Sequence, residues 1–286
     1  MSRTAMRRLA ERATHRLVIR RQLPSPFGQV RIYTSSEGGL RYLHPSLRNV
    51  DPGLLRLVTE VVKPGDIVWD IGANVGLFSF AAAAAAGPSG QVLAVEPDVA
   101  LAPLLRRSAA LNRDAAAVEV FPVAVAADLG VGRFHIARRN RSTSYLDGFG
   151  TTQTGGIRAT ELVPTVTLTW LATHFRSPNV IKIDVEGAEI DVLSGGAAVL
   201  KNLPAIICEV ASCNAAGVAE ILVEHGYTLY DGDIPSHLRE PLTVARPATV
   251  AIHGSSDRLM PGRQTDTLPA VPRLSGQGHA SISRLR

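Results

Sequence analysis

The chain has few aromatic residues and few cysteines, and each shortage excludes a class of protein. Phe, Trp and Tyr make up 5% of the 286 residues, whereas apolar residues make up 45%. Ala, Val and Leu dominate the apolar positions, which favours a close-packed α/β protein over a sandwich or a disordered chain. The length suits one such domain with extensions, or at most two small domains.

Only two cysteines occur, Cys208 and Cys213, and their spacing matches no zinc or redox motif. Cys208 lies in an apolar, strand-like run, so we expect a buried free thiol there. The absence of a disulfide framework predicts a reducing compartment, the cytoplasm.

No apolar run is long enough to cross a bilayer. The longest, residues 75–87, is short and Ala-rich, and we expect it to form a buried helix. The first residues also lack the apolar core of a secretory signal. We therefore expect no transmembrane segment.

Acidic residues are scarce at both ends of the chain. Residues 1–21 carry a net charge of +6 and residues 255–286 carry +3, which leaves −4 for residues 22–254 out of a total of +5. A nucleic-acid-binding protein usually carries its positive charge on the folded domain, so no nucleic-acid partner is expected. Basic tails permit weak contact with anionic surfaces, although solvated tails are the favoured interpretation.

The pattern along the chain predicts four segments. Residues 1–25 form a basic arm, and residues 26–50 form a β-hairpin cap with strands at 27–33 and 40–43 around a turn at 37–39. A main domain follows at 51–254, with an insertion at about 125–165, and residues 255–286 read as a disordered tail.

Strands and helices alternate through the main domain. Apolar runs that read as strands occur at the following positions: 67–70, 91–96, 118–121, 179–184, 205–210, 226–230 and 248–252. Pro122 should end the third of them. Such alternation predicts a parallel sheet with helices on both faces and a ligand site at the carboxyl ends of the strands. Four acids fall at or near those ends, and we expect them to converge: Asp70, Glu96, Asp184 and Glu209.

The loop after the first of these strands reads Asp70-Ile71-Gly72-Ala73-Asn74-Val75-Gly76. Gly72 and Gly76 allow a ligand to lie against the backbone at the start of a helix. The loop lacks the three glycines of a dinucleotide fingerprint, and Asp70 would repel a pyrophosphate but attract a cationic ligand. S-Adenosylmethionine fits because it carries an ammonium and a sulfonium but no phosphate. Glu96 is placed to accept both ribose hydroxyls, a role it would share in a NAD site.

At this point the chain resembles a known family. The loop at 70–76 is similar to motif I of class I S-adenosylmethionine-dependent methyltransferases, and Glu96-Pro97 is similar to the acidic end of their second strand. Residues 181–189 resemble the signature of the FkbM-type methyltransferases. The resemblance covers about residues 50–230 and implies a Rossmann-like fold with a seven-stranded, mostly parallel sheet whose last strand is antiparallel. It also implies O-methylation of a small-molecule hydroxyl, often on a sugar or natural product.

Methyl transfer to an alcohol needs alignment of the reacting atoms and a base for the hydroxyl proton. We predict cofactor binding by Asp70, Gly72, Asn74, Gly76 and Glu96. Asp184 is the predicted base, Glu186 a second carboxylate, and Lys182 a partner for one of the acids. A divalent cation among these acids stays an alternative, but no His lies near them in the sequence, and we assign no metal ligand.

Two other functions stay open. A nicotinamide-dependent oxidoreductase on a related fold is weakened by the missing glycine and by the absence of a Tyr-x-x-x-Lys pair. A non-catalytic protein of methyltransferase-like fold would bind a partner through the basic arms. The acceptor is not identified by the sequence, and a homo-oligomer is compatible with it.

Overall fold

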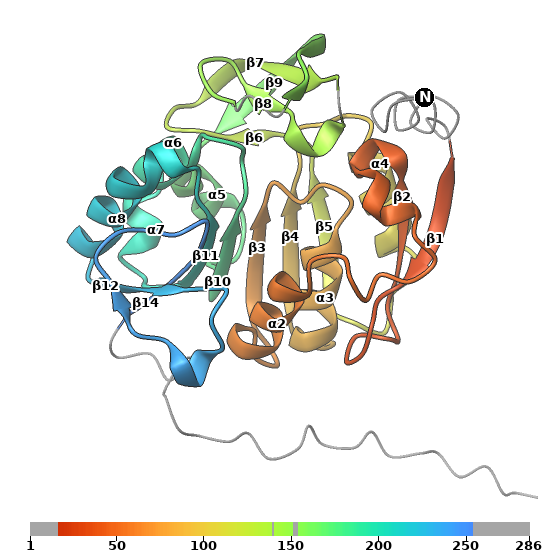
Figure 1. The fold of residues 1–286 in the computed structure, drawn as a ribbon, viewed down its shortest axis with the longest axis horizontal. Coiled ribbons are helices and arrows are strands. Elements are labelled where there is room, and N and C mark those ends of the chain that lie inside the picture. Colours follow the sequence, from red (N-terminus) through yellow and green to blue (C-terminus); the bar gives the residue numbers. More distant parts are fainter. Residues whose placement is uncertain (1–16, 139, 151–153, 254–286) are drawn as a thin grey trace, which may run out of the picture.

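The computed structural model describes residues 17–138, 140–150 and 154–253. Its centre is a sheet of eight strands in the order β13-β12-β14-β11-β10-β3-β4-β5 (Figure 1). The strands of this sheet are β3 (Ile67–Ile71), β4 (Gln91–Val95), β5 (Ala117–Phe121), β10 (Val180–Ile183), β11 (Ala205–Glu209), β12 (Tyr227–Asp231), β13 (Pro241–Leu242) and β14 (Ala248–His253).

The predicted seven strands are present, and β14 is antiparallel to its neighbours β11 and β12, as the resemblance implied. β5, β4, β3, β10 and β11 are parallel to one another. The prediction of seven strands was one short, because β13 adds an eighth at the edge. Its two residues include Pro241 and are too short to show a periodicity.

Helices cover both faces of the sheet. They are α2 (Pro52–Val61), α3 (Leu77–Ala86), α4 (Ala102–Ala109), α5 (Leu168–His174), α6 (Glu189–Ser194), α7 (Ala197–Leu200) and α8 (Ala215–Glu224). One core cluster joins α2, α3 and α4 to one face, and a second joins α5, α6, α7 and α8 to the other. Among the described residues, no helix is long and apolar enough to cross a bilayer.

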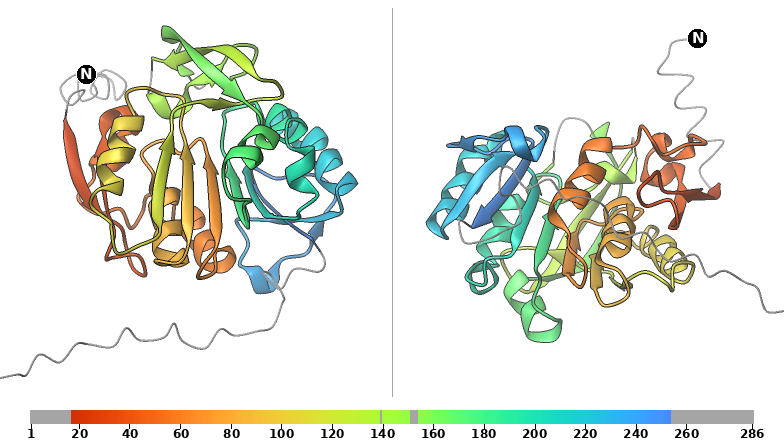
Figure 2. Two further views of the ribbon diagram at one scale, coloured as in Figure 1. Left: turned by 180° about the vertical axis from the view of Figure 1, so that it is seen from behind. Right: turned by 90° about the horizontal axis from the view of Figure 1, so that it is seen from below.

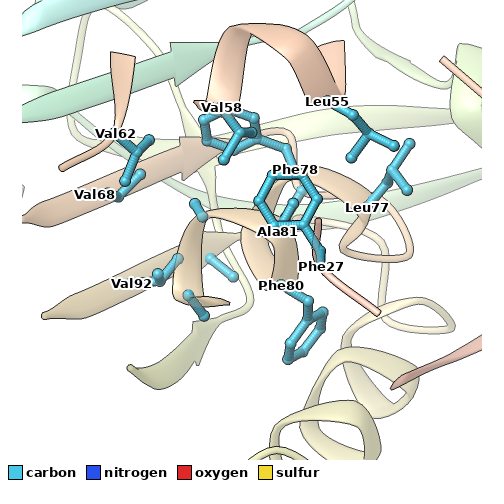
Figure 3. Packing of buried hydrophobic residues seen from close by; sticks show 14 of the residues in the cluster. Phe27, Leu55, Val58, Val62, Val68, Leu77, Phe78, Phe80, Ala81 and Val92 are labelled. Carbon is cyan, nitrogen blue, oxygen red and sulfur yellow. The ribbon is translucent and has the colours of Figure 1, made fainter. Parts of the chain in front are cut away.

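The side chains of β3 alternate between these two clusters. Trp69 packs with the α5–α8 cluster, whereas Val68 packs with the α2–α4 cluster. Asp70 is two residues from Val68 and therefore points toward α3. Phe78 of α3 lies among Val58 and other apolar side chains in this layer (Figure 3). The Ala-rich α3 is buried almost all round, as expected for the apolar run at 75–87.

The N-terminal segment differs from the predicted hairpin cap. β2 (Arg31–Ser35) pairs with β1 (Val18–Gln22), a segment that we expected to lie in the basic arm. The strand predicted at 40–43 is wrong, because Leu40–Leu43 forms a 3-10 helix, η2, directly after the 3-10 helix η1 (Ser36–Gly38). A four-residue apolar pattern fits either conformation. A Cβ on Gly38 would lie 2.3 Å from Val75, so this segment packs against the glycine loop instead of forming a hairpin turn.

The insertion forms a second sheet above the carboxyl ends of the main strands (Figures 1 and 2). Its order is β6-β9-β7-β8, from β6 (Ala124–Val125), β7 (Gly130–Ala137), β8 (Tyr145–Leu146) and β9 (Ile157–Val166). The break at Pro122 is confirmed, since β5 ends at Phe121. Most of the predicted basic arm and all of the predicted tail lie outside the described residues, so the segment boundaries stay predictions.

Candidate active site

A cavity of about 360 Å³ lies between the carboxyl ends of the main sheet and the insertion. Its floor comes from the loops after β3, β4 and β10, and its roof from β7, β8 and η3 (Arg141–Thr143). Apolar side chains, among them Leu77, Phe78 and Leu101, line one part of it. Charged side chains line another: Arg41, Asp51, Glu96, Arg141, Lys182, Asp184, Glu186 and Glu209.

Gly72 and Gly76 have different roles in the loop after β3. Gly72 lines the cavity at a φ of 82°, and a Cβ on it would lie 1.9 Å from the carbonyl oxygen of Asp184. Only glycine lets the loops after β3 and β10 come this close. Gly76 is not part of the cavity wall, and a Cβ on it would meet Phe80 and Leu105 at 2.6 and 2.7 Å. Gly76 therefore serves packing and turn geometry.

Asn74 and Glu96 form a polar part of the cavity wall. Asn74 has a φ of 51°, its backbone N–H donates to Glu96 Oε2 at 2.6 Å, and its Nδ2 donates to the Gly38 carbonyl at 3.3 Å. Asn74 Oδ1 is buried and has no hydrogen-bond partner among the described residues. It is an unpaired acceptor on a residue that lines the cavity.

The carboxyl of Glu96 is 5% exposed and fixed by the backbone. The Asp98 N–H donates to its Oε1 at 2.9 Å, so each oxygen receives one N–H bond and retains a lone pair. Burial raises the pKa of Glu96 to about 7, and nearby Asp98 adds to the rise. Glu96 lines the cavity, and its predicted contact with ribose hydroxyls stays a prediction.

Asp70 lies beneath the cavity and does not line it. It is fully buried, accepts a hydrogen bond from Ser79 of α3, and lies 3.2 Å from Lys182 Nζ. The register explains this pair, because Lys182 of β10 is directly beside Asp70 of β3. The predicted contact of Asp70 with the ligand is therefore replaced by contact with a buried lysine.

Lys182 connects the two loops that form the cavity floor. Its Nζ donates to the Gly72 carbonyl at 2.9 Å and to Asp184 Oδ2 at 3.1 Å. Burial alone would lower the pKa of Lys182, but the Asp184 and Asp70 carboxylates raise it above its ordinary value. The side chain is 6% exposed and stays charged, so it is suited to positioning and not to proton transfer.

Three predicted acids line the same cavity: Asp184, Glu186 and Glu209. Burial, followed by the charges of Asp184 and Glu209, raises the pKa of Glu186 to about 8. The charge of Asp184, followed by burial, raises the pKa of Glu209 to about 7. Near neutral pH the cluster therefore retains at least one proton beside Asp184. Among the described residues, no three His, Cys, Asp or Glu side chains form a group that could hold a metal ion.

The sequence did not indicate two arginines of the cavity wall. Arg141 of the insertion donates to both oxygens of Asp98 at 2.6 and 2.7 Å, and to Glu37 at 2.5 Å. Burial tends to lower the pKa of Arg41 in η2, but Tyr42 and then Asp51 raise it overall. The chain has many arginines, and the sequence pattern around Arg41 and Arg141 does not distinguish these two from the others. They reach the cavity only through the folding of segments that are distant in sequence.

A family model described as the methyltransferase FkbM domain matches residues 70–237, more than half of the chain. The chain belongs to the FkbM methyltransferase domain family. This match and the strand arrangement confirm the predicted Rossmann-like class I methyltransferase fold and an S-adenosylmethionine-dependent methyltransferase.

Two characterised proteins are similar in sequence. The hexuronic acid methyltransferase AglP of Haloferax volcanii is 28% identical over 177 residues, which are 60% of this chain and 67% of AglP. The AMB antimetabolite synthetase AmbE of Pseudomonas aeruginosa is 41% identical over 92 residues, which are 32% of this chain. The matched region is only 4% of AmbE.

Solved structures of methyltransferases resemble the chain at low identity. An S-adenosylmethionine-dependent O-methyltransferase from Thermotoga maritima has a TM-score of 0.39 at 16% identity, covering 71% of this chain and 65% of that chain. Fibrillarin from Aeropyrum pernix, in complex with S-adenosylmethionine, has a TM-score of 0.37 at 13% identity, covering 77% of each chain.

Proposed function

We propose that this methyltransferase methylates a hydroxyl oxygen of a sugar or a sugar-like natural product. The observation that carries the proposal is the cluster of Asp184, Glu186 and Glu209 on the wall of the cavity. An alcohol must lose its proton as it accepts a methyl group, and a carboxylate beside it favours that loss. Several carboxyl groups on one wall also suit an acceptor that offers several hydroxyl donors. The name of the distant relative AglP, a hexuronic acid methyltransferase, agrees with a sugar acceptor.

Gly72, Asn74 and Glu96, which line one part of the cavity, fit S-adenosylmethionine. Glu96 would hold the ribose hydroxyls, Asn74 Oδ1 would accept from the ammonium, and Gly72 would allow close backbone approach. When bound, the cofactor supplies a methyl carbon that its sulfonium has already activated. The acids around the cavity disfavour a pyrophosphate, so the geometry weighs against the nicotinamide alternative.

Asp184 is the proposed base. Its carboxyl is 30% exposed toward the cavity, and one of its oxygens is held by Lys182 Nζ. That contact fixes the direction of the Asp184 carboxyl, while the other oxygen can accept the hydroxyl proton. Lys182 also holds the Gly72 carbonyl, so one buried side chain aligns the proposed base with the cofactor loop.

Glu186 and Glu209 are proposed to bind the acceptor. With a pKa raised to about 8, Glu186 is protonated at neutral pH and can donate a hydrogen bond as well as accept one. Glu209 is near its midpoint at the same pH and can pass the released proton to solvent.

A labelling experiment tests the acceptor class. The purified protein is incubated with S-adenosylmethionine carrying a labelled methyl group and with neutral sugars, hexuronic acids or amino sugars. We expect the label in a product that withstands mild alkali, as a methyl ether does. Label that is lost in mild alkali would indicate a methyl ester, and label on nitrogen would indicate an N-methyltransferase; either result contradicts the proposal.

A further inference from the structure

Three arginines gather around the ring of Tyr33 on the outer face of the N-terminal hairpin. Arg20 of β1 is the register partner of Tyr33, and Arg31 is two residues from Tyr33 on β2, so all three side chains emerge on one face. The guanidinium carbon of Arg107, from α4, lies 4.1 Å from the centroid of the Tyr33 ring. We call this group the Tyr33 face. Figure 1 shows β1, β2 and α4 together at one side of the molecule.

None of these three arginines has a carboxylate within 4.0 Å in the part of the chain that the structure describes. Other arginines of the domain do form ion pairs, as Arg141 does with Asp98 and Arg239 does with Glu60. Gathering like charges without a counter-charge is unfavourable by itself, and it points to an anionic partner.

The Tyr33 face is held rigidly. The Tyr33 N–H donates to Ser108 Oγ at 2.8 Å, and the Arg31 N–H donates to Asn112 Oδ1 at 3.0 Å. Asn112 Nδ2 donates back to the Arg31 carbonyl at 2.7 Å. These bonds fix α4 to the edge of β2, so the arginines are presented together without a large ordering cost on binding.

Aliphatic side chains continue the same face. Val18 is two residues before Arg20 and is 37% exposed, and Leu17 beside it is 48% exposed. The Tyr33 ring is covered by Arg107 and is therefore not free to stack on a base, which disfavours single-stranded nucleic acid. The residues that precede the hairpin add five arginines in sequence and one glutamate, Glu11. Basic and aliphatic side chains side by side suit a lipid headgroup region.

We propose that the Tyr33 face binds the surface of an anionic lipid bilayer. Arginine binds phosphate groups through paired N–H donors, and the exposed aliphatic groups can enter the boundary between headgroups and acyl chains. On the opposite face of the hairpin, Arg21 of β1 donates to the Leu43 carbonyl of η2 at 2.7 Å, which ties β1 to the domain. The proposal is independent of the acceptor proposed above.

Co-sedimentation of the full chain with vesicles tests this proposal. We expect binding to vesicles of phosphatidylcholine with about a third phosphatidylglycerol, and little binding to phosphatidylcholine alone. The triple variant R20Q/R31Q/R107Q should bind about a hundredfold more weakly, since each basic residue near an anionic surface contributes about fivefold. Binding should also weaken as salt is added.

A second triple variant, R133Q/R176Q/R246Q, removes the same charge from exposed positions elsewhere and should bind like the wild type. Circular dichroism and basal methyl transfer show whether both variants fold. Unchanged vesicle binding by the Tyr33-face variant would overturn the proposal, as would equal loss in both triple variants. Loss of binding to a short DNA duplex with vesicle binding retained would instead assign the face to nucleic acid and overturn it too.

Discussion

Glu186 has a left-handed backbone conformation that residues other than glycine seldom adopt. Its φ is 53°, and Gly187 follows at 110°. This backbone conformation destabilises the folded state by about 1–3 kcal/mol, and it persists only where the surrounding packing imposes it. Here the loop after β10 is pressed against Gly72, with the Asp184 carbonyl at the position a Cβ would need. With this backbone conformation, Glu186 lines the cavity beside Asp184.

The raised pKa of Glu186 predicts a pH-dependent stability. Between its ordinary value of 4.5 and its folded value of about 8, the unfolded chain loses the proton while the folded chain retains it. Stability from this group is therefore fully present below about pH 4.5 and is lost as the pH rises toward 8. Glu186→Gln has no proton to lose, so it should match the wild type at pH 4.5 and exceed it by about 2 kcal/mol at pH 8, a figure reduced for solvent screening.

Urea unfolding of both proteins across this pH range measures the difference. Glu220→Gln removes an exposed carboxylate on α8 and serves as the control. A gap between wild type and Glu186→Gln that stays constant with pH would show that the Glu186 pKa is not raised.

Gly72→Ala tests the close approach of the two loops. The new Cβ would meet the Asp184 carbonyl at 1.9 Å, and alanine is strained at a φ of 82°. We expect a loss of at least about 3 kcal/mol in the free energy of unfolding, with weaker cofactor binding because Lys182 loses its alignment. Gly87→Ala is the control, since φ is also positive there but no atom lies within 4 Å of the new Cβ. Similar costs for both variants would attribute the effect to backbone conformation alone.

At the scale of the elements, Arg141 connects three parts of the fold. It reaches from the insertion to Asp98 after β4 and to Glu37 in η1, which also pairs with Arg158 of β9. Asp98 is fully buried and Arg141 is largely buried, so the pair sits where water screens it little. Burial tends to lower the pKa of Arg141, yet its bonds to Asp98 and Glu37 raise it overall. These ion pairs connect the insertion, which forms the roof of the cavity, to the loop after β4 and to η1.

Arg141→Ala should therefore destabilise the protein by about 3–5 kcal/mol, because it leaves the Asp98 carboxylate buried without its partner. The same change should weaken S-adenosylmethionine binding by opening the cavity. The double variant Arg141→Ala/Asp98→Asn should regain part of the stability but not the affinity. Thermal unfolding and calorimetry measure the two effects, with the exposed Arg138→Ala as control. Normal affinity in Arg141→Ala would show that the ion pairs do not shape the cavity.

At the scale of the whole molecule, the main sheet could be predicted from the sequence. The second sheet and the pairing of β1 with β2 could not. Buried parallel strands are continuous apolar runs, and the acids at their carboxyl ends could be assigned to one edge from topology alone. Asp184, Glu186 and Glu209 were brought together in this way. The burial of Asp70 was not foreseen, because side-chain direction depends on which face α3 covers, and Lys182 became its partner only through the register of β10 with β3.

The parts that escaped prediction depend on contacts distant in sequence. β1 and β2 pair across a turn whose flanking pattern is short, and the second sheet joins β6 to β9 from positions about 40 residues apart. Arg141 contacts Glu37 across 104 residues. No local period encodes these contacts, since they depend on the final packing of the insertion against the N-terminal segment.

The central claim is that the loop after β3 binds the cofactor while Asp184, after β10, accepts the proton. Asp184→Asn separates the two roles, since it keeps the size of the side chain and one oxygen for Lys182. Calorimetry should show that the variant binds S-adenosylmethionine within about threefold of the wild type, and a labelled-methyl assay should show turnover reduced by about 10²–10⁴. Normal methylation by Asp184→Asn would contradict the assignment of the base, and preferential binding of NAD by the wild type would contradict the whole account.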